Sequence, residues 1–494
     1  MNLKEILEVT AREVPQKPAI IFGPQRITYR ELDEVSNRVA SLLLTSGLKR
    51  GEHVAILVSH RPEWVSSYFG VIKAGGVAVL FSSALKAPEL DTLLRDSDTN
   101  ILITEKPFSL MLASVLPGLP ELRRVLEVDT GSYKVMLAGS SGLAPDVVIN
   151  DSDVATIIYT SGVLGRQKGV VHTHASLLGT PEIVSAGIGR TREDVVIDPV
   201  PFFYLLGLSE LLFGSIIKGA TVVIVPQFTP RLILEVIERE KGSILYGVPA
   251  MHNSLALLRK EVIDGYDVSS LRVASTAGAK TSPRLMKMLE DKLGLTLCET
   301  YGLSELSVVA MSTIADQKLG TVGKPICRLR IVDDNGEEVA TGEIGEAVFK
   351  APWAMKEYYK APDLTAQVFR DGWFYTGDSV RMDSEGYLEY VEKKSFIVVT
   401  AAGLKISPWE VENLLLQHPG VAEAVYVGVK GPRSQLIPTA FIVPGEGKSV
   451  TEGELARFCY QNLADFKVPK RFKFIESIPK TGSGKVNRRL LQEG

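Results

Sequence analysis

The sequence predicts an α/β protein with a large N-terminal domain of helix-covered sheets and a small α/β C-terminal domain. The chain has 494 residues, more than the roughly 250–300 that one hydrophobic core supports, so at least two domains are expected. Short runs rich in valine and isoleucine alternate with helical segments, a pattern typical of parallel sheets covered by helices on both faces. Around residues 328–349 the pattern changes to antiparallel strand signals, which favour a small barrel-like element.

The elements of the N-terminal half follow from the hydrophobic pattern. Residues 1–7 carry charge within an apolar run and predict an amphipathic helix, not a signal peptide. Buried strands are expected at 54–58, 77–80 and 154–158. An apolar run over 204–217 is shorter than the roughly 20 residues of a membrane span, so it predicts a buried helix.

The same alternation continues toward the C-terminus. A helix is expected over 231–240, and Asn335-Gly336 predicts a hairpin turn. Thr451 and Glu454 form the pattern of a capping box at a helix start. Further strands are expected at 221–225, 243–248, 421–429, 439–443 and 472–475. The last hundred or so residues therefore predict a compact α/β unit, a common domain size.

Composition excludes several classes of function. The 55 basic and 58 acidic side chains give a net charge of -3, which provides no general attraction to nucleic acids or anionic membranes. Cys298, Cys327 and Cys459 are far apart and form neither a metal-ligand spacing nor a disulfide framework. We therefore expect a cytoplasmic protein without a nucleic-acid partner or a membrane-spanning segment, and the sequence leaves a homodimer open.

A glycine-rich segment predicts a phosphate-binding loop. Directly after the expected strand at 154–158, residues 159–169 read YTSGVLGRQKG. Glycines allow backbone N–H groups to point inward as an anion-binding nest, and Lys168 adds a positive charge. The segment lacks the spacing of a P-loop, so an ordinary glycine-rich turn is the alternative.

Three further segments carry side chains suited to a nucleotide. In residues 301–305 (YGLSE) an aromatic, a hydroxyl and a carboxylate follow one another, and a carboxylate suits Mg²⁺. Asp378, after a glycine turn, could accept ribose hydroxyls or bond its own backbone. Lys485 stands at the tip of a glycine-rich loop, where domain closure could bring it to a developing charge; a solvated tail is the alternative.

Taken together and in order, these segments resemble the adenylate-forming superfamily of acyl-CoA synthetases, carrier-protein adenylation domains and luciferases. The resemblance covers essentially the whole chain and is greatest to bacterial fatty acyl-CoA ligases. The motifs that carry it lie at 219–223, 247–251, 301–305 and 408–412. It implies an N-terminal adenylation domain (1–392) of two helix-covered sheets and a small distorted β-barrel. It also implies a mobile C-terminal domain (393–494) that carries the catalytic lysine.

The resemblance also implies residue roles. Lys485, Glu305 and Lys168 are the expected catalytic residues, and Glu305 with Thr160 the expected Mg²⁺ ligands. The expected ATP- and AMP-binding residues are Thr160, Ser161, Gly162, Gly165, Lys168, Gly278, Ala279, Tyr301, Ser304, Asp378 and Lys393. The expected acyl- and CoA-binding residues are Tyr204, Val248, Ala277, Gly403 and Lys405.

The implied reaction consumes ATP with Mg²⁺, activates a carboxylic acid as its acyl-adenylate and transfers the acyl group to a thiol. A medium- or long-chain fatty acid and CoA are the first expectation. The alternatives are an aryl-CoA ligase and an enzyme that loads a carrier protein. A diverged nucleotide-binding protein without turnover is an alternative of another class.

The sequence departs from the family pattern at two places. Val163 and Leu164 replace hydroxyl residues and Gln167 replaces a proline, which predicts slower adenylation or a different loop path. In the hinge, Lys393 or Lys394 stands where an arginine is usual, and neither Phe396 nor Ile397 can act as the hinge acid.

Two other positions each leave a question open. Tyr204 replaces a histidine and either forms a wall of the acyl pocket or packs in the core. His172 and His174 are two residues apart at an apparent helix start, which puts their rings on different faces and argues against a zinc pair.

Overall fold

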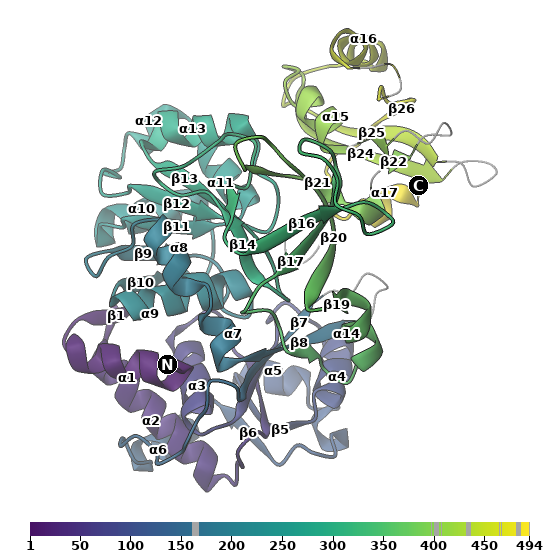
Figure 1. Ribbon diagram of the computed structural model, residues 1–494. Coiled ribbons are helices and arrows are strands. Elements are labelled where there is room, and N and C mark those ends of the chain that lie inside the picture. The colour runs from purple at the N-terminus through teal and green to yellow at the C-terminus, as the bar shows by residue number, and fades with distance from the viewer. Residues whose placement is uncertain are drawn as a thin grey trace. The chain divides into compact units, whose positions relative to one another are not determined.

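The chain forms two compact α/β units in the computed structural model (Figure 1). The structure describes residues 1–160, 167–396, 398–399, 405–406, 408–430, 436–463, 465, 467–480 and 486–493. One unit comprises Met1–Leu319 and Lys350–Arg370, and the other comprises Gly320–Phe349 and Asp371–Gly494. The predicted α/β class is confirmed in both units.

The first sheet of the larger unit runs in the order β14-β13-β12-β11-β9-β10-β1-β2. Its strands are β1 (Pro18–Phe22), β2 (Gln25–Thr28), β9 (Val195–Asp198), β10 (Thr221–Ile224), β11 (Ile244–Gly247), β12 (Val273–Thr276), β13 (Thr296–Leu303) and β14 (Ser307–Met311). Only β2 and β14 are antiparallel to their neighbours in this series. The carboxyl ends of the parallel strands therefore share one edge, where ligands bind in open α/β sheets.

The second sheet of this unit runs in the order β18-β8-β7-β4-β3-β5-β6. Its strands are β3 (His53–Leu57), β4 (Val77–Leu80), β5 (Thr99–Thr104), β6 (Arg124–Glu127), β7 (Val154–Thr160), β8 (Lys168–Thr173) and β18 (Glu357–Tyr358). Here β8 is antiparallel to β7, and β18 is antiparallel to β8. The distant segment 357–358 thus becomes the strand next to β8.

Helices cover these sheets. They are α1 (Leu3–Glu13), α2 (Tyr29–Thr45), α3 (Pro62–Lys73), α4 (Ala87–Asp96), α5 (Lys106–Met111), α6 (Gly131–Gly139), α7 (His174–Leu178), α8 (Pro181–Gly187), α9 (Gly214–Lys218), α10 (Pro230–Glu240), α11 (Pro249–Ala256), α12 (Lys260–Ile263), α13 (Pro283–Leu293) and α14 (Pro362–Val368), with a 3₁₀ turn η1 (Leu116–Gly118) and a π-helix η2 (Leu206–Phe213). The amphipathic helix predicted at the N-terminus is α1, which begins at a capping box formed by Asn2 and Glu5. None of the described helices is long and apolar enough to cross a membrane.

The smaller unit contains a barrel-like sheet and a separate α/β part. The barrel-like sheet comprises β16 (Arg328–Val332), β17 (Gly345–Lys350), β20 (Trp373–Met382) and β21 (Leu388–Lys393). The rest comprises η3 (Lys394–Phe396), β22 (Val398–Val399), β23 (Lys405–Ile406), α15 (Pro408–Leu415), β24 (Val421–Lys430), β25 (Leu436–Pro444), α16 (Glu452–Asn462), β26 (Arg471–Phe474) and α17 (Arg488–Gln492). The short strands β15 (Lys324–Pro325) and β19 (Phe369–Arg370) complete the described strands.

Local sequence signals account for several of these elements. The hairpin predicted at Asn335-Gly336 is confirmed, because the Val339 N–H donates to the Ile331 carbonyl at 2.9 Å and Gly336 has a φ of +87°. The capping box of Thr451 with Glu454 starts α16, as predicted. Residues 301–303 of the YGLSE segment belong to β13, and Ser304 and Glu305 lie in the turn that follows it.

The apolar run over 204–217 forms a buried helix, as predicted, but part of it is the π-helix η2. This helix carries Glu210, whose carboxyl group is buried and accepts a hydrogen bond from the Thr300 hydroxyl at 3.3 Å. Burial raises the pKa of Glu210 from 4.5 to about 8. Glu210 is therefore protonated in the folded protein at neutral pH.

The raised pKa of Glu210 predicts that the free energy of unfolding of the protein depends on pH. In the unfolded chain the carboxyl ionises near pH 4.5, whereas in the folded protein it holds its proton to about pH 8. Its contribution to stability is complete below pH 4.5 and is lost as the pH rises through 8, at up to about 1.4 kcal/mol per pH unit. We expect Glu210→Gln to become more stable than the wild type over this range, measured by denaturant unfolding. A difference between the two proteins that is independent of pH would contradict this assignment.

Candidate active site

The predicted phosphate loop is framed by two paired strands. β7 ends at Thr160 and β8 begins at Lys168, and these two residues face each other in the antiparallel register. Ser161, Gly162 and Gly165, with the replaced positions Val163 and Leu164, lie outside the described residues. The structure thus places the two ends of the predicted loop side by side on adjacent strands.

A tyrosine joins two of the predicted activation residues. The Tyr358 hydroxyl donates a hydrogen bond of 2.6 Å to Glu305 Oε1, and Lys168 Nζ lies 4.6 Å from the centre of the Tyr358 ring. Burial and the neighbouring Glu305 raise the pKa of Tyr358, so the hydroxyl keeps its proton and donates. Lys168 therefore lies over the face of the Tyr358 ring and Glu305 accepts from its hydroxyl, so one tyrosine contacts both predicted residues.

Sequence reasoning missed Tyr358. It reaches Glu305 only because β18 pairs with β8, with Tyr358 opposite Val170. The sequence carries an aromatic pair, Tyr358-Tyr359, but no recognisable motif around it. Only the pairing of distant strands shows that Tyr358 belongs to this site.

Tyr358→Phe tests the role of this hydroxyl. The variant keeps the ring beside Lys168 but removes the hydrogen bond to Glu305. Losing such a supporting partner of a metal ligand costs about 10–100-fold in metal affinity or activity. We expect about a tenfold slower ATP–pyrophosphate exchange and a higher Mg²⁺ requirement, with thermal stability close to the wild type. Unchanged exchange and Mg²⁺ dependence would contradict the role.

The turn that carries Ser304 and Glu305 is held by His172. Burial lowers the pKa of His172 to about 4, so the ring is neutral. Its Nε2 lies 2.7 Å from the Ser304 carbonyl, which can only accept, and its Nδ1 lies 3.0 Å from the Ser176 hydroxyl. The His174 ring accepts instead from the Leu3 N–H at 3.3 Å. The two histidines thus form hydrogen bonds with different partners. Among the described residues there is no group of three or more histidine, cysteine or acidic side chains that could hold a metal ion.

Another group of predicted residues lies at the shared edge of the first sheet. Val248 follows β11, and Ala277, Gly278 and Ala279 follow β12. Gly278 has a φ of +86°, a conformation that favours glycine. Tyr301 lies in the neighbouring strand β13. The parallel register of β11, β12 and β13 brings these positions to one end of the sheet.

A buried acid lies in β13, and Tyr204 lies between β9 and η2. Glu299, in β13, is buried and accepts from the Thr281 N–H at 3.2 Å, and burial raises its pKa to about 8. Like Glu210, it was not predicted, because an acidic residue in an apolar strand gives no sign of its burial. Tyr204 is half-buried and stacks at an angle on Phe203, with ring centres 4.4 Å apart.

In the smaller unit, Asp378 pairs with Lys393. They face each other across β20 and β21, and Lys393 Nζ lies 2.6 Å from Asp378 Oδ1. Lys394 instead pairs with Asp334 at 2.9 Å and Glu346 at 3.1 Å. Of the two lysines considered for the ribose position, Lys393 is thus the one beside the predicted ribose acid.

Lys485, Gly403 and the side chain of Lys405 lie outside the described residues. The segment 481–485 is bracketed by an isolated antiparallel bridge between Lys480 and Val486. The predicted catalytic lysine, Lys485, therefore directly precedes Val486, which is paired with Lys480.

Two buried carboxylates and a half-buried guanidinium, which sequence reasoning also missed, hold the helix that follows this segment. Arg488, in α17, contacts Glu412 at 2.6 Å and Glu392 at 3.0 Å. Burial raises the pKa of Glu392, and the nearby guanidinium opposes that rise. The triad ties α17 to α15 and to the end of β21.

Comparisons with known proteins show which family the chain resembles. The family described as AMP-binding enzyme matches residues 7–359, and the AMP-binding enzyme C-terminal domain matches residues 410–485. A feruloyl-CoA synthase of an Amycolatopsis species is 32% identical over 96% of this chain and 95% of its own length. A long-chain-fatty-acid–CoA ligase of Bacillus subtilis (strain 168) is 31% identical over 100% and 94%.

A solved structure is similar over the whole chain. The anthranilate CoA ligase AuaEII in complex with anthranoyl-AMP superposes with a TM-score of 0.93 at 27% identity, covering 100% of this chain and 96% of that one. The two family matches together span most of the sequence. The chain therefore belongs to the AMP-binding enzyme family, among the AMP-forming acyl-CoA synthetases of the adenylate-forming superfamily.

Proposed function

We propose that this enzyme activates a carboxylic acid with ATP through an acyl-adenylate and transfers the acyl group to CoA. The single observation that carries the proposal is the convergence of Lys168 and Glu305 on Tyr358, beside the end of β7 at Thr160. A cation, a carboxylate and a hydroxyl at one place suit a magnesium-bound triphosphate.

The donor set fits Mg²⁺, a hard cation that prefers oxygen. Glu305 offers a carboxylate whose Oε1 is already oriented by Tyr358, and Thr160 offers a hydroxyl. When bound, the ion would neutralise charge on the phosphate oxygens. Lys168 would add a second positive charge on the same side, and the ring of Tyr358 would limit where its ammonium can lie.

In the first half-reaction the acid's carboxylate attacks the α-phosphorus, and pyrophosphate leaves. Two anions approach each other, so positive charge must be placed where negative charge accumulates. We assign this role to Lys485, between the acid and the α-phosphate. Asp378 and Lys393 would hold the ribose, and Gly278, Ala279 and Tyr301 the adenine.

In the second half-reaction the CoA thiolate attacks the acyl carbon, the mixed anhydride breaks, and AMP leaves. No charge develops on the α-phosphate in this step, so Lys485 is not needed there. We propose that the C-terminal domain rotates and presents Gly403 and Lys405 to the thiol. We place the boundary of the moving domain between residues 392 and 393. A cytoplasmic location and a homodimer stay predictions from the sequence.

For the acid, we propose a medium- or long-chain fatty acid, which the apolar motifs at 219–223 and 247–251 favour. An aryl acid is the second candidate, supported by the similarity to the feruloyl-CoA synthase and to the anthranilate CoA ligase. Tyr204, Val248 and Ala277 would line the acyl pocket in either case.

The test is pyrophosphate release with ATP, Mg²⁺ and a panel of aliphatic and aromatic acids, with and without CoA. Release with one acid class, together with the corresponding CoA thioester, would establish the ligase and its substrate. Acyl transfer to a carrier protein but not to CoA would favour the carrier-loading alternative. ATP binding without release for every acid would favour a nucleotide-binding protein without turnover.

A further inference from the structure

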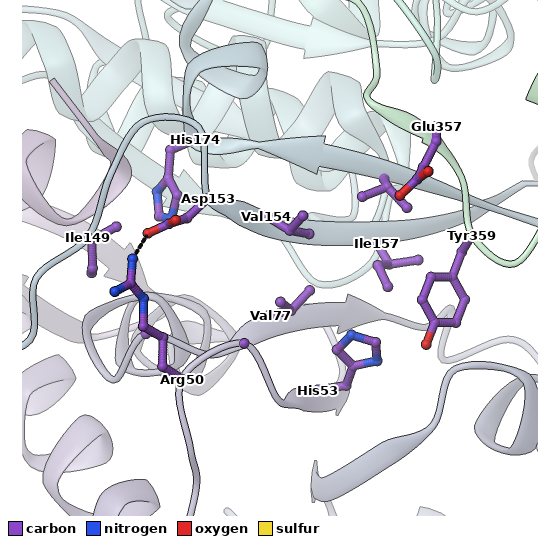
Figure 2. Close-up of a pocket in the computed structure, with 13 residues that line it drawn as sticks. Arg50, His53, Val77, Ile149, Asp153, Val154, Ile157, His174, Glu357 and Tyr359 are labelled. Atoms are coloured by element: carbon purple, nitrogen blue, oxygen red, sulfur yellow. Dashed lines mark hydrogen bonds and ion pairs between the residues drawn. The ribbon is translucent and has the colours of Figure 1, made fainter.

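A pocket lies in the larger unit, at the amino-terminal ends of β3, β4 and β7. Its volume is about 270 Å³, the space of about nine water molecules at ~30 Å³ each. That is just below the ~300 Å³ at which pockets for drug-sized ligands begin. Figure 2 shows the side chains around it. None of its lining residues belongs to the proposed ATP, acid or CoA sites.

The floor of this pocket is apolar and its charges are almost all paired. Val77, Ile157 and Val171 present hydrocarbon from three adjacent strands. At one end Arg50 and Asp153 form an ion pair of 2.6 Å, drawn in Figure 2, so their charges cancel. The remaining acidic side chain of the lining, Glu357, lies at the other end of the pocket.

That end combines a carboxylate with two aromatic rings. Glu357 is exposed at the rim, and its side chain forms no hydrogen bond or ion pair with the described residues. Two residues further along the chain, the Tyr359 ring meets the His53 ring edge to face, with ring centres 5.3 Å apart. An unpaired carboxylate next to aromatic rings and a hydrocarbon floor suits a cation with an apolar body.

The same strands also carry the proposed activation residues. Side chains alternate between the two faces of a strand. In β18 and the residue after it, Glu357 and Tyr359 line the pocket, whereas Tyr358 between them contacts Glu305 and Lys168. In β8, Val171 lines the pocket, whereas Lys168 and His172 serve the opposite side.

We propose that this pocket binds a small aralkylammonium compound, and that its occupancy is coupled through β18 to the magnesium and phosphate residues. The ammonium group pairs with Glu357, and the aromatic ring lies on the floor beside His53 and Tyr359. A ligand that contacts Glu357 and Tyr359 restrains the strand between them and thereby holds Tyr358 against Glu305. The coupling to activation depends on the proposed function, but the binding itself does not.

Binding is tested with phenethylamine and its neutral counterpart 2-phenylethanol, by calorimetry in the absence of ATP and acid. We expect the wild type to bind the amine at least tenfold more tightly than the alcohol. Glu357→Gln should abolish that preference. Glu235→Gln, a matched change at an exposed position of α10, should keep it. Equal affinity for both compounds, an unchanged preference in Glu357→Gln, or no binding of the amine at millimolar concentration would overturn the site.

The coupling is tested by repeating the titration with saturating Mg²⁺ and ATP. Because linkage is reciprocal, the amine's affinity should rise by the same factor by which the amine raises the affinity for ATP. Tyr358→Phe should bind the amine but lose most of this factor. An amine affinity that does not change with Mg²⁺ and ATP would overturn the coupling. Since the first titration needs no turnover, failure of the ligase proposal would not affect it.

Discussion

Lys485→Ala should slow acyl-adenylate formation by about 10²–10³-fold, the usual cost of removing one group that stabilises transition-state charge. Thioester formation from supplied acyl-adenylate should change little, because no phosphoryl charge develops in that step. The measurement compares pyrophosphate release, in single turnover, with the release of AMP from the acyl-adenylate and CoA. The split between the half-reactions is what identifies the role.

A matched control lies a few residues away. Lys480 closes the base of the same segment and pairs with Glu423 at 3.0 Å. Lys480→Ala removes the same charge from the same part of the chain, and it should leave both half-reactions within a few-fold of the wild type. Equal loss of both half-reactions in Lys485→Ala would indicate a general structural role instead.

Glu305→Gln should have the second largest effect. The amide keeps the shape of the side chain and can still accept from Tyr358, but it no longer offers a charged oxygen to Mg²⁺. Because losing even a supporting partner of a metal ligand costs about 10–100-fold, a direct ligand should cost at least that much in Mg²⁺ affinity. Pyrophosphate exchange, titrated with Mg²⁺ at saturating ATP, measures the shift in the half-maximal concentration.

Glu235→Gln is the control for the loss of one negative charge. Calorimetric binding of ATP without metal is the control that shows whether the nucleotide site of Glu305→Gln is intact. A loss of rate that excess Mg²⁺ restores would agree with the assignment. An equal loss at every Mg²⁺ concentration would contradict it and would point to a role for Glu305 in the fold of the turn that His172 holds.

The periodicity of the sequence sufficed to predict most of the fold. Valine- and isoleucine-rich runs became the strands β3, β4, β7, β10 and β11, because burial on both faces of a parallel sheet demands such runs. The turn at Asn335-Gly336 and the cap at Thr451 were predictable because both depend on residues close in sequence. Sequence patterns therefore predict those features of the structure that depend only on residues close together in the chain.

The candidate site was only partly predictable. Motifs pointed to Glu305 and Lys168, but Tyr358 reaches them through a strand pairing between distant segments. Asp378 was weighed against bonding to its own turn, yet it pairs with Lys393 across two strands. The apolar run over 204–217 predicted a buried helix but not that the π-helix buries the carboxyl group of Glu210 beside Thr300. In each case the missing information was which distant residue lies alongside.

The two-sided strand pair of β8 and β18 has an evolutionary consequence. Substitutions at Val171, Glu357 or Tyr359 alter one face, whereas those at Lys168 or Tyr358 alter the other. In β8 and β18, selection for catalytic turnover therefore acts on the residues of one face, such as Lys168 and Tyr358. A lineage could lose, gain or retune its response to an effector by drift at the remaining positions, without passing through an inactive enzyme.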